Sequence, residues 1–356
     1  MKRRKLFIVM ISFCLFFMAG ILPTMSYAQP STKVIKWRVQ NNYGMTAEKP
    51  LLPELYLAAG WAKWVEDISN GLIKIDVVPA GTVCSPLDTF HAISRGVLDG
   101  ALTHAGFDKG VMGPIVDIAF GLPMAWQEPA AVRDAMEYYG LAKVIKEAYA
   151  KHNVHYFYAP PGMTYHIGTT FPLQNLNDLR GKKIRAVGIY ADYVRKLGAS
   201  PTVVPGPEMY MALKMGTLDG MVYALDSVPE LKLYEVIKCY IVDPNICTGN
   251  MAIYVSKKSV DSLPAELKNQ IIKYSDYIIT ATSLDRAASA RKAVSISEKL
   301  GVKLVRLSPQ DKEKVERASL EIWQEIRKAA EGKQDAYVIK AMDILEEQRK
   351  DWGLAK

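Results

Sequence analysis

HAISRGVLDGALTH at residues 91–104 is matched, 120 residues later, by MALKMGTLDGMVYA at residues 211–224. The two stretches share an alanine, a glycine and a Leu-Asp-Gly triplet at equivalent positions. The identical pairs are Ala92/Ala212, Gly96/Gly216, Leu98/Leu218, Asp99/Asp219 and Gly100/Gly220. Upstream of each stretch, Val-Val-Pro occurs at residues 77–79 and again at 203–205. Each copy therefore predicts a β-branched strand, an amphipathic helix that ends at a glycine, and a second strand.

This pattern is a βαβ unit used twice, and it predicts an α/β protein with two similar lobes and a ligand cleft between them. In each lobe the Leu-Asp-Gly triplet would end the buried helix and start a core strand. Asp99 and Asp219 are therefore expected to be turn residues rather than a pair of catalytic carboxylates.

The length of the chain favours two domains over one. It has 356 residues, 49% of them hydrophobic, which is enough to bury a large core. We expect a first lobe over residues 29–160, a second over 161–250, and then a return strand to the first lobe with hinge and C-terminal helices over 251–356.

Residues 1–28 resemble a secretory signal peptide, with a basic start, an apolar run and a Ser-Tyr-Ala cleavage site. We expect cleavage after Ala28 and export to the periplasm; the alternative is a retained membrane anchor. The basic start carries four of the eight units of formal positive charge, which leaves +4 on the mature chain. Basic and acidic residues are mixed along this chain, so the charge gives no reason to expect a nucleic-acid partner.

Three cysteines remain after the signal segment, and their spacing is not that of a metal site. Cys239 and Cys247 flank a turn at Pro244, so they either form a disulfide in an oxidising compartment or stay free and buried.

The rest of the pattern alternates strands and helices. Residues 128–149 predict one long helix, and residues 154–159 predict a strand that runs into Pro-Pro-Gly, where the chain would cross to the second lobe. Further strands are expected at 34–40, 72–78, 100–104, 164–170, 203–205, 220–223, 251–255 and 302–305. Further helices are expected at 55–68, 87–94, 191–197 and 208–215, over most of 264–300, and over 309–352.

The chain has none of the common catalytic motifs: no nucleophile elbow, no phosphate-binding loop, no dinucleotide fingerprint and no zinc-protease helix. Arg185 is the most informative single residue, because it falls at the predicted carboxyl end of a strand, next to Gly188 and a helix start. A guanidinium there can hold a carboxylate through two parallel hydrogen bonds. The alternative is an ordinary surface arginine in a Lys/Arg-rich turn.

Five segments together resemble the periplasmic solute-binding subunits of TRAP transporters, the tripartite ATP-independent family. They are residues 1–28, 72–100, 179–185, 197–201 and 208–220. The resemblance implies a two-lobed periplasmic-binding-protein fold of the type II kind, with a central ligand cleft and a helical C-terminal cover. It also implies capture of a small organic acid, delivery to a membrane permease, and a salt bridge from Arg185 to the ligand carboxylate.

The segment 162–169 is similar to the branch of this family that binds 2-oxo and 2-hydroxy acids, some members of which use a metal ion. The positions that match metal-ligating acids there are Val222 and Thr248 in this chain, and a glutamine position matches His166. A hard cation needs oxygen ligands, so we predict no metal and no cofactor, with Asp226 as the one residue that could substitute.

Several residues at predicted strand ends and turns are expected to line the ligand pocket with Arg185. They are Asn42, Tyr43, Phe107, Tyr165, His166, Tyr190, Tyr223 and Asp226. Two other hypotheses stay open: a secreted enzyme that uses His166 or Asp226 as acid or base, and a binding subunit of an ATP-driven transporter or sensor. The helices after Pro309 are also expected to be able to pack against a second copy of the chain.

Overall fold

The computed structural model describes residues 33–43, 53–225, 227–283 and 286–354. The chain divides into two compact units, Met1–Val34 and Ile35–Lys356, and every described helix and strand belongs to the second unit. The predicted signal peptide, residues 1–28, lies outside the described residues, and so does Asp226.

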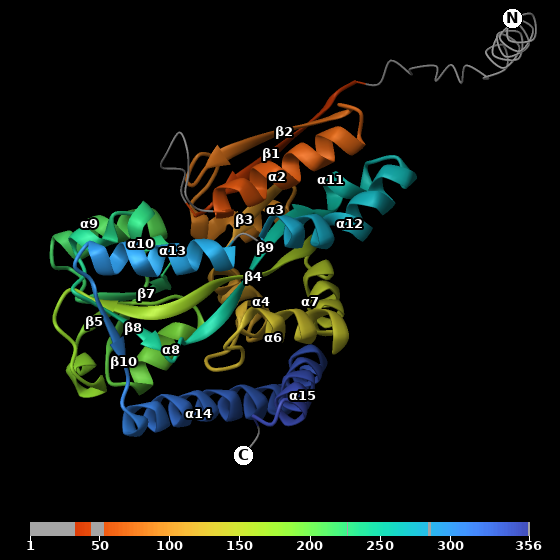
Figure 1. Cartoon of the computed structure of the whole chain (residues 1–356). Helices are drawn as coiled ribbons and strands as arrows, with labels where there is room; N and C mark the ends of the chain where they lie inside the picture. Colours follow the sequence, from red (N-terminus) through yellow and green to blue (C-terminus); the bar gives the residue numbers. More distant parts are fainter. Residues whose placement is uncertain (1–32, 44–52, 226, 284–285, 355–356) are drawn as a thin grey trace, which may run out of the picture. The chain divides into compact units, whose positions relative to one another are not determined.

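The first copy of the repeat contributes strands on both sides of a central strand (Figure 1). β1 (Ile35–Asn41) lies between β2 (Ile73–Pro79) and β3 (Gly100–Thr103) and is parallel to both. The helical connection from β2 to β3 includes α3 (Thr89–Ser94). The predicted βαβ unit is therefore present, with another strand between its two strands. α2 (Pro53–Ile68) packs on β2.

The second copy has the same arrangement. β5 (Lys183–Arg185) lies between β6 (Ser200–Thr202) and β7 (Gly220–Ala224) and is parallel to both, and α9 (Met209–Lys214) belongs to the connection from β6 to β7. The strand predicted at residues 203–205 is wrong: β6 ends before Val203. It is an edge strand, where a proline such as Pro201 costs no ladder hydrogen bond.

The two repeated aspartates make equivalent hydrogen bonds. The backbone N–H of Arg38 in β1 donates to Asp99 Oδ2 at 2.9 Å, and that of Lys183 in β5 donates to Asp219 Oδ2 at 2.7 Å. Each aspartate thus ties the turn after the helix to the central strand of its own unit, as the predicted scaffold role requires.

The glycine after each aspartate is also equivalent in the two copies. A Cβ on Gly100 would lie 2.7 Å from the carbonyl oxygen of Tyr254, and a Cβ on Gly220 would lie 2.5 Å from that of Gly168. No real side chain tolerates such a distance, so backbone packing between neighbouring strands requires glycine at both positions.

Two long antiparallel strands connect the copies into one sheet. β4 (Val154–Thr169) and β9 (Cys247–Ser256) pair with each other; β9 also pairs with β3, and β4 with β7. The strand order is β2-β1-β3-β9-β4-β7-β5-β6. The separate strands predicted at 154–159 and 164–170 are thus one strand, with a register shift between Ala159 and Met163.

β8 (Cys239–Asp243), which was not predicted, pairs with β4 and with β10 (Lys303–Arg306). Cys239 in β8 and Cys247 in β9 are buried and free, so the alternative without a disulfide describes this structure.

The single helix predicted over residues 128–149 is wrong. The segment consists of α6 (Pro129–Arg133), a π-helical turn η3 (Asp134–Tyr138) and α7 (Leu141–Ala150). The break falls at Gly140, whose φ of 80° is left-handed and cannot continue a right-handed helix.

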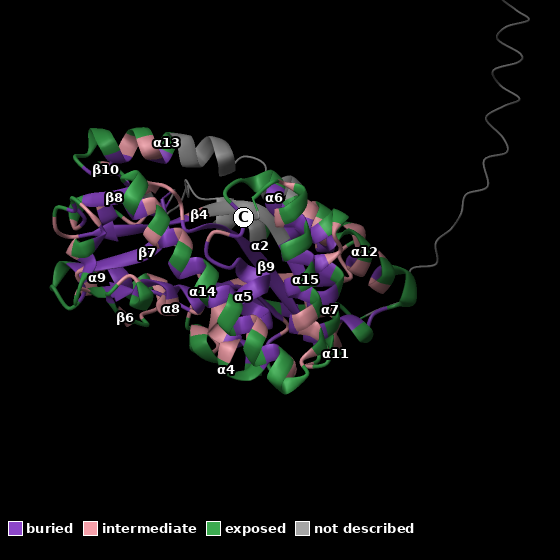
Figure 2. Ribbon diagram, turned by 90° about the horizontal axis from the view of Figure 1, so that it is seen from below, coloured by how far each residue is buried: buried purple, intermediate pink, exposed green. Residues whose placement is uncertain are grey.

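The C-terminal third is helical, as predicted, with α12 (Ala265–Ser283), α13 (Arg286–Lys299), α14 (Pro309–Lys333) and α15 (Ala336–Asp351). α14 is anchored by Trp323, whose Nε1 donates to the carbonyl of Pro123 at 3.0 Å. Figure 2 shows buried residues along the strands and exposed residues on the outer faces of helices. Over the described part of the chain, no helix combines the length and the apolar character needed to cross a membrane.

The remaining short elements complete the described chain. They are η1 (Pro86–Asp88), η2 (Ala105–Asp108), α4 (Lys109–Met112), α5 (Ile115–Phe120), η4 (Leu176–Leu179), α8 (Ile189–Lys196), η5 (Gly206–Glu208), α10 (Ser227–Glu230), η6 (Leu233–Glu235) and α11 (Lys257–Asp261).

Because the two aspartates make equivalent hydrogen bonds, replacing either one should lower the stability of the protein by a similar amount. Asp99→Ala and Asp219→Ala should each lower the free energy of unfolding by about 1.5–3 kcal/mol, because each removes a charged acceptor from a backbone N–H. Urea denaturation measures this. A loss in one variant only would contradict the structural equivalence of the two copies.

Candidate functional site

Arg185 ends β5 and is buried, with 4% of its surface exposed. Its Nε donates to the carbonyl of Val204 at 2.9 Å and its Nη1 to the carbonyl of Val222 at 3.1 Å. The guanidinium carbon lies 5.2 Å from the centre of the Tyr223 ring. The side chain is therefore held by two neutral acceptors and an aromatic face, in a fixed orientation.

Within the described residues, Arg185 forms no ion pair with a carboxylate. Burial lowers the pKa of its guanidinium, and the groups that act against this are three tyrosines and no acid. Arginine nevertheless keeps its charge in proteins. A buried charge without a counter-ion is costly, and an anion that enters the site removes that cost.

A small cavity adjoins Arg185. It is lined by Asn42, Tyr43, His104, Phe107, Arg185, Gly206 and Tyr223. The centre of a water molecule has about 10 Å³ in which to move, so the cavity has room for one water molecule at most. Five of these residues were predicted from the sequence, and the structure brings them together from separate strand ends and turns.

The side chain of Asn42 makes three hydrogen bonds inside the first repeat unit. Its Nδ2 donates to Thr89 Oγ1 and to Thr103 Oγ1, both at 2.9 Å, and its Oδ1 accepts from Gln40 Nε2 at 2.8 Å. The Tyr43 hydroxyl donates to the carbonyl of Thr103 at 3.3 Å. Asn42 therefore shapes the wall of the cavity through this network.

His104 was not predicted, although it follows β3 directly and precedes the Ala-Gly-Phe turn that the sequence marks. Its Nδ1 accepts a hydrogen bond from the N–H of Gly106 at 3.0 Å and so begins η2. Its ring centre lies 3.8 Å from that of Phe120. Burial, and then the charge of Arg185, lower the pKa of His104 to about 3, so the imidazole is neutral near pH 7.

The other predicted aromatic residues lie behind this wall. Tyr165 contacts His104 and Phe120, with ring centres 6.2 and 4.9 Å apart, and Tyr190 lies 5.4 Å from Phe120. Neither tyrosine lines the cavity.

His166 follows Tyr165 in β4, so its side chain points to the other face of the sheet. Its Nδ1 lies 2.9 Å from the carbonyl oxygen of Ile241, and its ring lies 5.6 Å from that of Tyr240. Burial lowers the pKa of His166 to about 4. The structure therefore does not bring His166 to the cavity.

A second cluster of charges fixes the start of α8, four residues after Arg185. Asp117 in α5 accepts from the N–H of Ile189 at 2.9 Å, and Lys109 in α4 pairs with Asp117 at 3.1 Å and with Asp192 of α8 at 2.9 Å. Burial raises the pKa of Asp117 to about 6, against the opposing charge of Lys109. This cluster joins the elements after β3 to the helix after β5.

Two glycines allow the segment after β3 to approach the start of α8. Gly188 has a φ of 58°, and a Cβ on it would lie 3.0 Å from the Cα of Gly106. The two backbones thus touch beside the cavity, where a side chain would hold them apart.

The residues do not show a metal centre. Among the described residues, no three His, Cys, Asp or Glu side chains lie together in a way that could hold an ion. Val222 gives its carbonyl to Arg185, and Thr248 is buried with an Oγ1 that has no partner in the described part of the chain. The absence of a metal stays a prediction, because Asp226 lies outside the described residues.

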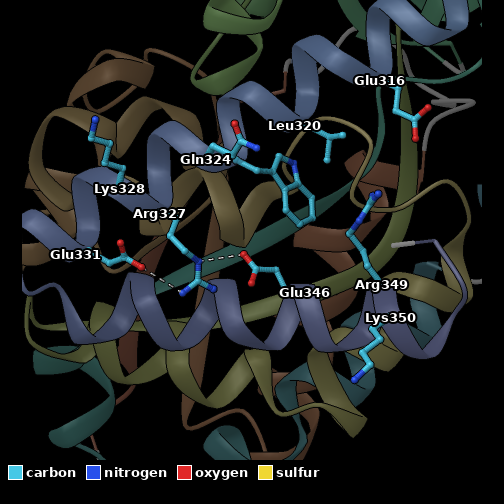
Figure 3. Close-up of a pocket in the computed structure, with 10 residues that line it drawn as sticks. Glu316, Leu320, Gln324, Arg327, Lys328, Glu331, Glu346, Arg349 and Lys350 are labelled. Atoms are coloured by element: carbon cyan, nitrogen blue, oxygen red, sulfur yellow. Dashed lines mark hydrogen bonds and ion pairs between the residues drawn. The ribbon is translucent and has the colours of Figure 1, made fainter. Parts of the chain in front are cut away.

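A larger groove, of about 650 Å³, lies between α14 and α15 (Figure 3). Four of its seven charged residues are exposed, and its Arg327 pairs with acidic residues of both helices. Arg327 bonds Asp343 at 2.8 Å and Glu346 at 3.0 Å. The groove is open to solvent, whereas the smaller Arg185 cavity contains a buried charge with no counter-ion from any residue that the structure describes. The Arg185 cavity is therefore the better candidate for ligand binding.

Residues 44–329 match the family model described as "Bacterial extracellular solute-binding protein, family 7". The match covers both repeat units except the central strand β1 of the first, and every residue of the Arg185 cavity except Asn42 and Tyr43. The chain belongs to this family. Together with the periplasmic relative and the TRAP protein structures described next, this match confirms the resemblance to periplasmic TRAP solute-binding proteins.

A relative described as a monocarboxylate 2-oxoacid-binding periplasmic protein of Nostoc sp. is 28% identical over 198 residues, which are 54% of this chain and 52% of that protein. The chain thus spans about half the length of this relative.

Solved structures of similar proteins share the fold. A TRAP periplasmic solute-binding protein from Chromohalobacter salexigens, with bound (S)-(+)-2-amino-1-propanol, has a TM-score of 0.77 and 20% identity, over 90% of this chain and 96% of that one. A protein from Bordetella bronchiseptica, a mixed-occupancy dimer with calcium and picolinate, has a TM-score of 0.78 and 19% identity, over 90% and 95%. The predicted two-lobed α/β fold is confirmed by these matches.

Next to the cavity, Asp108 of η2 is a buried carboxyl group beside the hydroxyls of Tyr149 and Tyr254, which lie 2.7 Å apart. Burial raises the pKa of Asp108 to about 8. In the folded family 7 protein this carboxyl group is therefore protonated at neutral pH, whereas in the unfolded chain it is ionised.

This difference predicts a pH dependence of stability. Because the folded pKa lies above the unfolded value of 3.8, the folded state binds more protons between about pH 4 and pH 8. The contribution of Asp108 to stability is thus complete below pH 4 and falls as the pH rises to 8. Asp108→Asn should flatten this slope and raise the melting temperature at pH 8 relative to the parent. An unchanged slope in differential scanning fluorimetry would contradict the protonated state.

Proposed function

We propose that this chain captures a small organic acid in the periplasm and delivers it to a TRAP-type membrane permease. The observation that carries the proposal is Arg185, a buried guanidinium with no carboxylate partner among the described residues. A ligand carboxylate would supply the missing counter-charge and accept the N–H groups that the carbonyls of Val204 and Val222 leave unused.

The comparisons support an acid but do not identify it. The Nostoc relative is described by its binding of 2-oxo acids and the Bordetella structure contains picolinate, whereas the Chromohalobacter structure contains an amino alcohol. The fold alone therefore leaves the charge of the ligand open. In this chain the buried charge of Arg185 favours an anion.

We also propose that the two lobes, residues 29–160 and 161–250, close over the acid, with residues 251–356 as return strand, hinge and cover. β4 and β9 would act as the hinge strands, because each pairs with strands of both repeat units. On this division, Lys109 of the first lobe pairs with Asp192 of the second. The small size of the cavity supports a closed state. Closure would exclude water from the ion pair between Arg185 and the acid.

The same proposal includes three further parts. Residues 1–28 act as a cleaved signal peptide, the protein binds without catalysing a reaction, and the exposed helices α14 and α15 offer a surface for a homodimer. The match to a solute-binding family supports the second part, and the dimer described for the Bordetella protein supports the third.

Arg185→Met should abolish the binding of acids, because it keeps an unbranched apolar side chain and removes the charged guanidinium. A thermal-shift panel of organic acids and their uncharged amides measures this. A ligand at about 100 times its Kd should stabilise the parent by roughly 2.7 kcal/mol. The matched control is Arg180→Met, on an exposed arginine of the same segment. The proposal is lost if no acid shifts the parent, if the amides bind equally well, or if Arg185→Met binds like the parent.

Lys109→Met should speed ligand release by about 3- to 10-fold, because it removes the contact between α4 and α8 and leaves the carboxylate of Asp117 buried without its cation. Stopped-flow fluorescence measures the dissociation rate. Lys196→Met serves as control, because Lys196 pairs with Glu321 and Glu325 of α14 instead. Equal release rates for the parent and Lys109→Met would argue against a role of this pair in closure.

A further inference from the structure

We propose that His104 is the second anchor of the site: its Nε2–H donates a hydrogen bond to an oxygen next to the ligand carboxylate, so that the site rejects ligands with an ammonium group there. This inference rests on the proposed function, in which Arg185 holds the carboxylate. It adds a residue that distinguishes ligands of equal size by whether the group next to the carboxylate accepts or donates hydrogen bonds.

The hydrogen bond at the other ring nitrogen sets the tautomer. Nδ1 accepts from the N–H of Gly106, so it carries no proton, and in a neutral imidazole the proton must then be on Nε2. Nε2 has no hydrogen-bond partner among the described residues, and it is not among the side-chain atoms that are fully buried without a partner. His104 also lines the cavity. Nε2–H is thus a donor available to a ligand.

The imidazole of His104 acts only as a neutral donor at Nε2 and does not take up a second proton. A second proton would have to go to Nδ1, which would break the bond from Gly106 and place a second cation in the same cavity as Arg185. Consistent with this, the pKa of His104 lies at about 3. Between pH 5.5 and 8 the ring is therefore a neutral donor, with no capacity to accept from an ammonium group.

The other described residues that line the cavity do not offer an acidic partner to a ligand ammonium group. No carboxylate of a described residue lines the cavity, and the amide oxygen of Asn42 already accepts one hydrogen bond from Gln40. A ligand ammonium would face the cation of Arg185 and the N–H of His104 without an acidic partner. A carbonyl or hydroxyl oxygen at the same place would accept from Nε2.

Two variants distinguish the role of His104 as a hydrogen-bond donor to the ligand from its role as the N-cap of η2. In His104→Asn the side-chain oxygen can still accept from Gly106, because asparagine is a favoured N-cap residue, but there is no Nε2 donor. In His104→Gln an N–H donor is kept at the ε position and the cap is weakened. If His104 only holds the turn, asparagine will behave like the parent and glutamine will not; the proposal expects the reverse.

The probes are matched sets with three carbon skeletons, measured by isothermal titration calorimetry. Each set compares the 2-oxo acid, the plain acid and the L-amino acid: pyruvate, propanoate and alanine; 2-oxo-3-methylbutanoate, 3-methylbutanoate and valine; phenylpyruvate, 3-phenylpropanoate and phenylalanine. The parent should bind the best 2-oxo acid at least 10-fold more tightly than its plain acid and should not bind the amino acid. His104→Asn should remove this difference and leave the plain acid unchanged, whereas His104→Gln should keep part of it.

The outcomes distinguish the inference from the proposed function. Arg185→Met should lose 2-oxo and plain acids together. An undiminished preference for the 2-oxo acid in His104→Asn, or binding of the amino acid by the parent, overturns the role of His104 and leaves that of Arg185 standing. Failure of the parent to bind any of the nine probes counts against both. The pH dependence of affinity from pH 5.5 to 8 should also be the same in the parent and in His104→Asn, because Asp108 and Asp117 titrate in both. A 10-fold larger fall in the parent would show an imidazolium instead.

Discussion

The burial of one guanidinium without a counter-ion in the described part of the chain is the constraint on which the rest of the site depends. The carbonyls of Val204 and Val222 and the ring of Tyr223 orient Arg185 but do not neutralise it. The desolvation of a charge is expensive, and a protein that keeps it in this state gains when an anion arrives. Because the guanidinium is held in place before the ligand arrives, the site selects anionic ligands.

The repeated βαβ unit explains how the chain places that charge. In each unit the aspartate of the Leu-Asp-Gly triplet is bonded to the central strand, and the glycine after it allows a neighbouring backbone to approach closely. β5 is such a central strand, and Arg185 is its last residue. The equivalent strand of the first unit, β1, ends at Asn41, just before the cavity residues Asn42 and Tyr43. Equivalent strand ends in the two units therefore line one cavity.

Much of this architecture could be predicted from the sequence because it depends on local patterns. The repeat marked the two units, and the predicted strand end at Arg185 is present. The errors have physical causes that lie outside local periodicity. Gly140 interrupts an otherwise helical segment, and β4 passes through two prolines without ending.

The site itself was predicted less completely. Asn42, Tyr43, Phe107 and Tyr223 were found because they end or follow predicted strands, and the structure brings them to Arg185. His104 was missed because an isolated histidine carries no signal; its role depends on the N–H of Gly106 and on the nearness of Arg185. His166 was selected by its match to a family position, and strand alternation directs it to the other face of the sheet.

A crystal structure of the protein with a bound organic acid tests the central claim most directly. The account predicts the ligand carboxylate at hydrogen-bonding distance, about 2.7–2.9 Å, from the guanidinium nitrogens of Arg185, in a cavity enlarged to hold the acid. An acid bound in the groove between α14 and α15, with Arg185 still bonded only to backbone carbonyls, would contradict it.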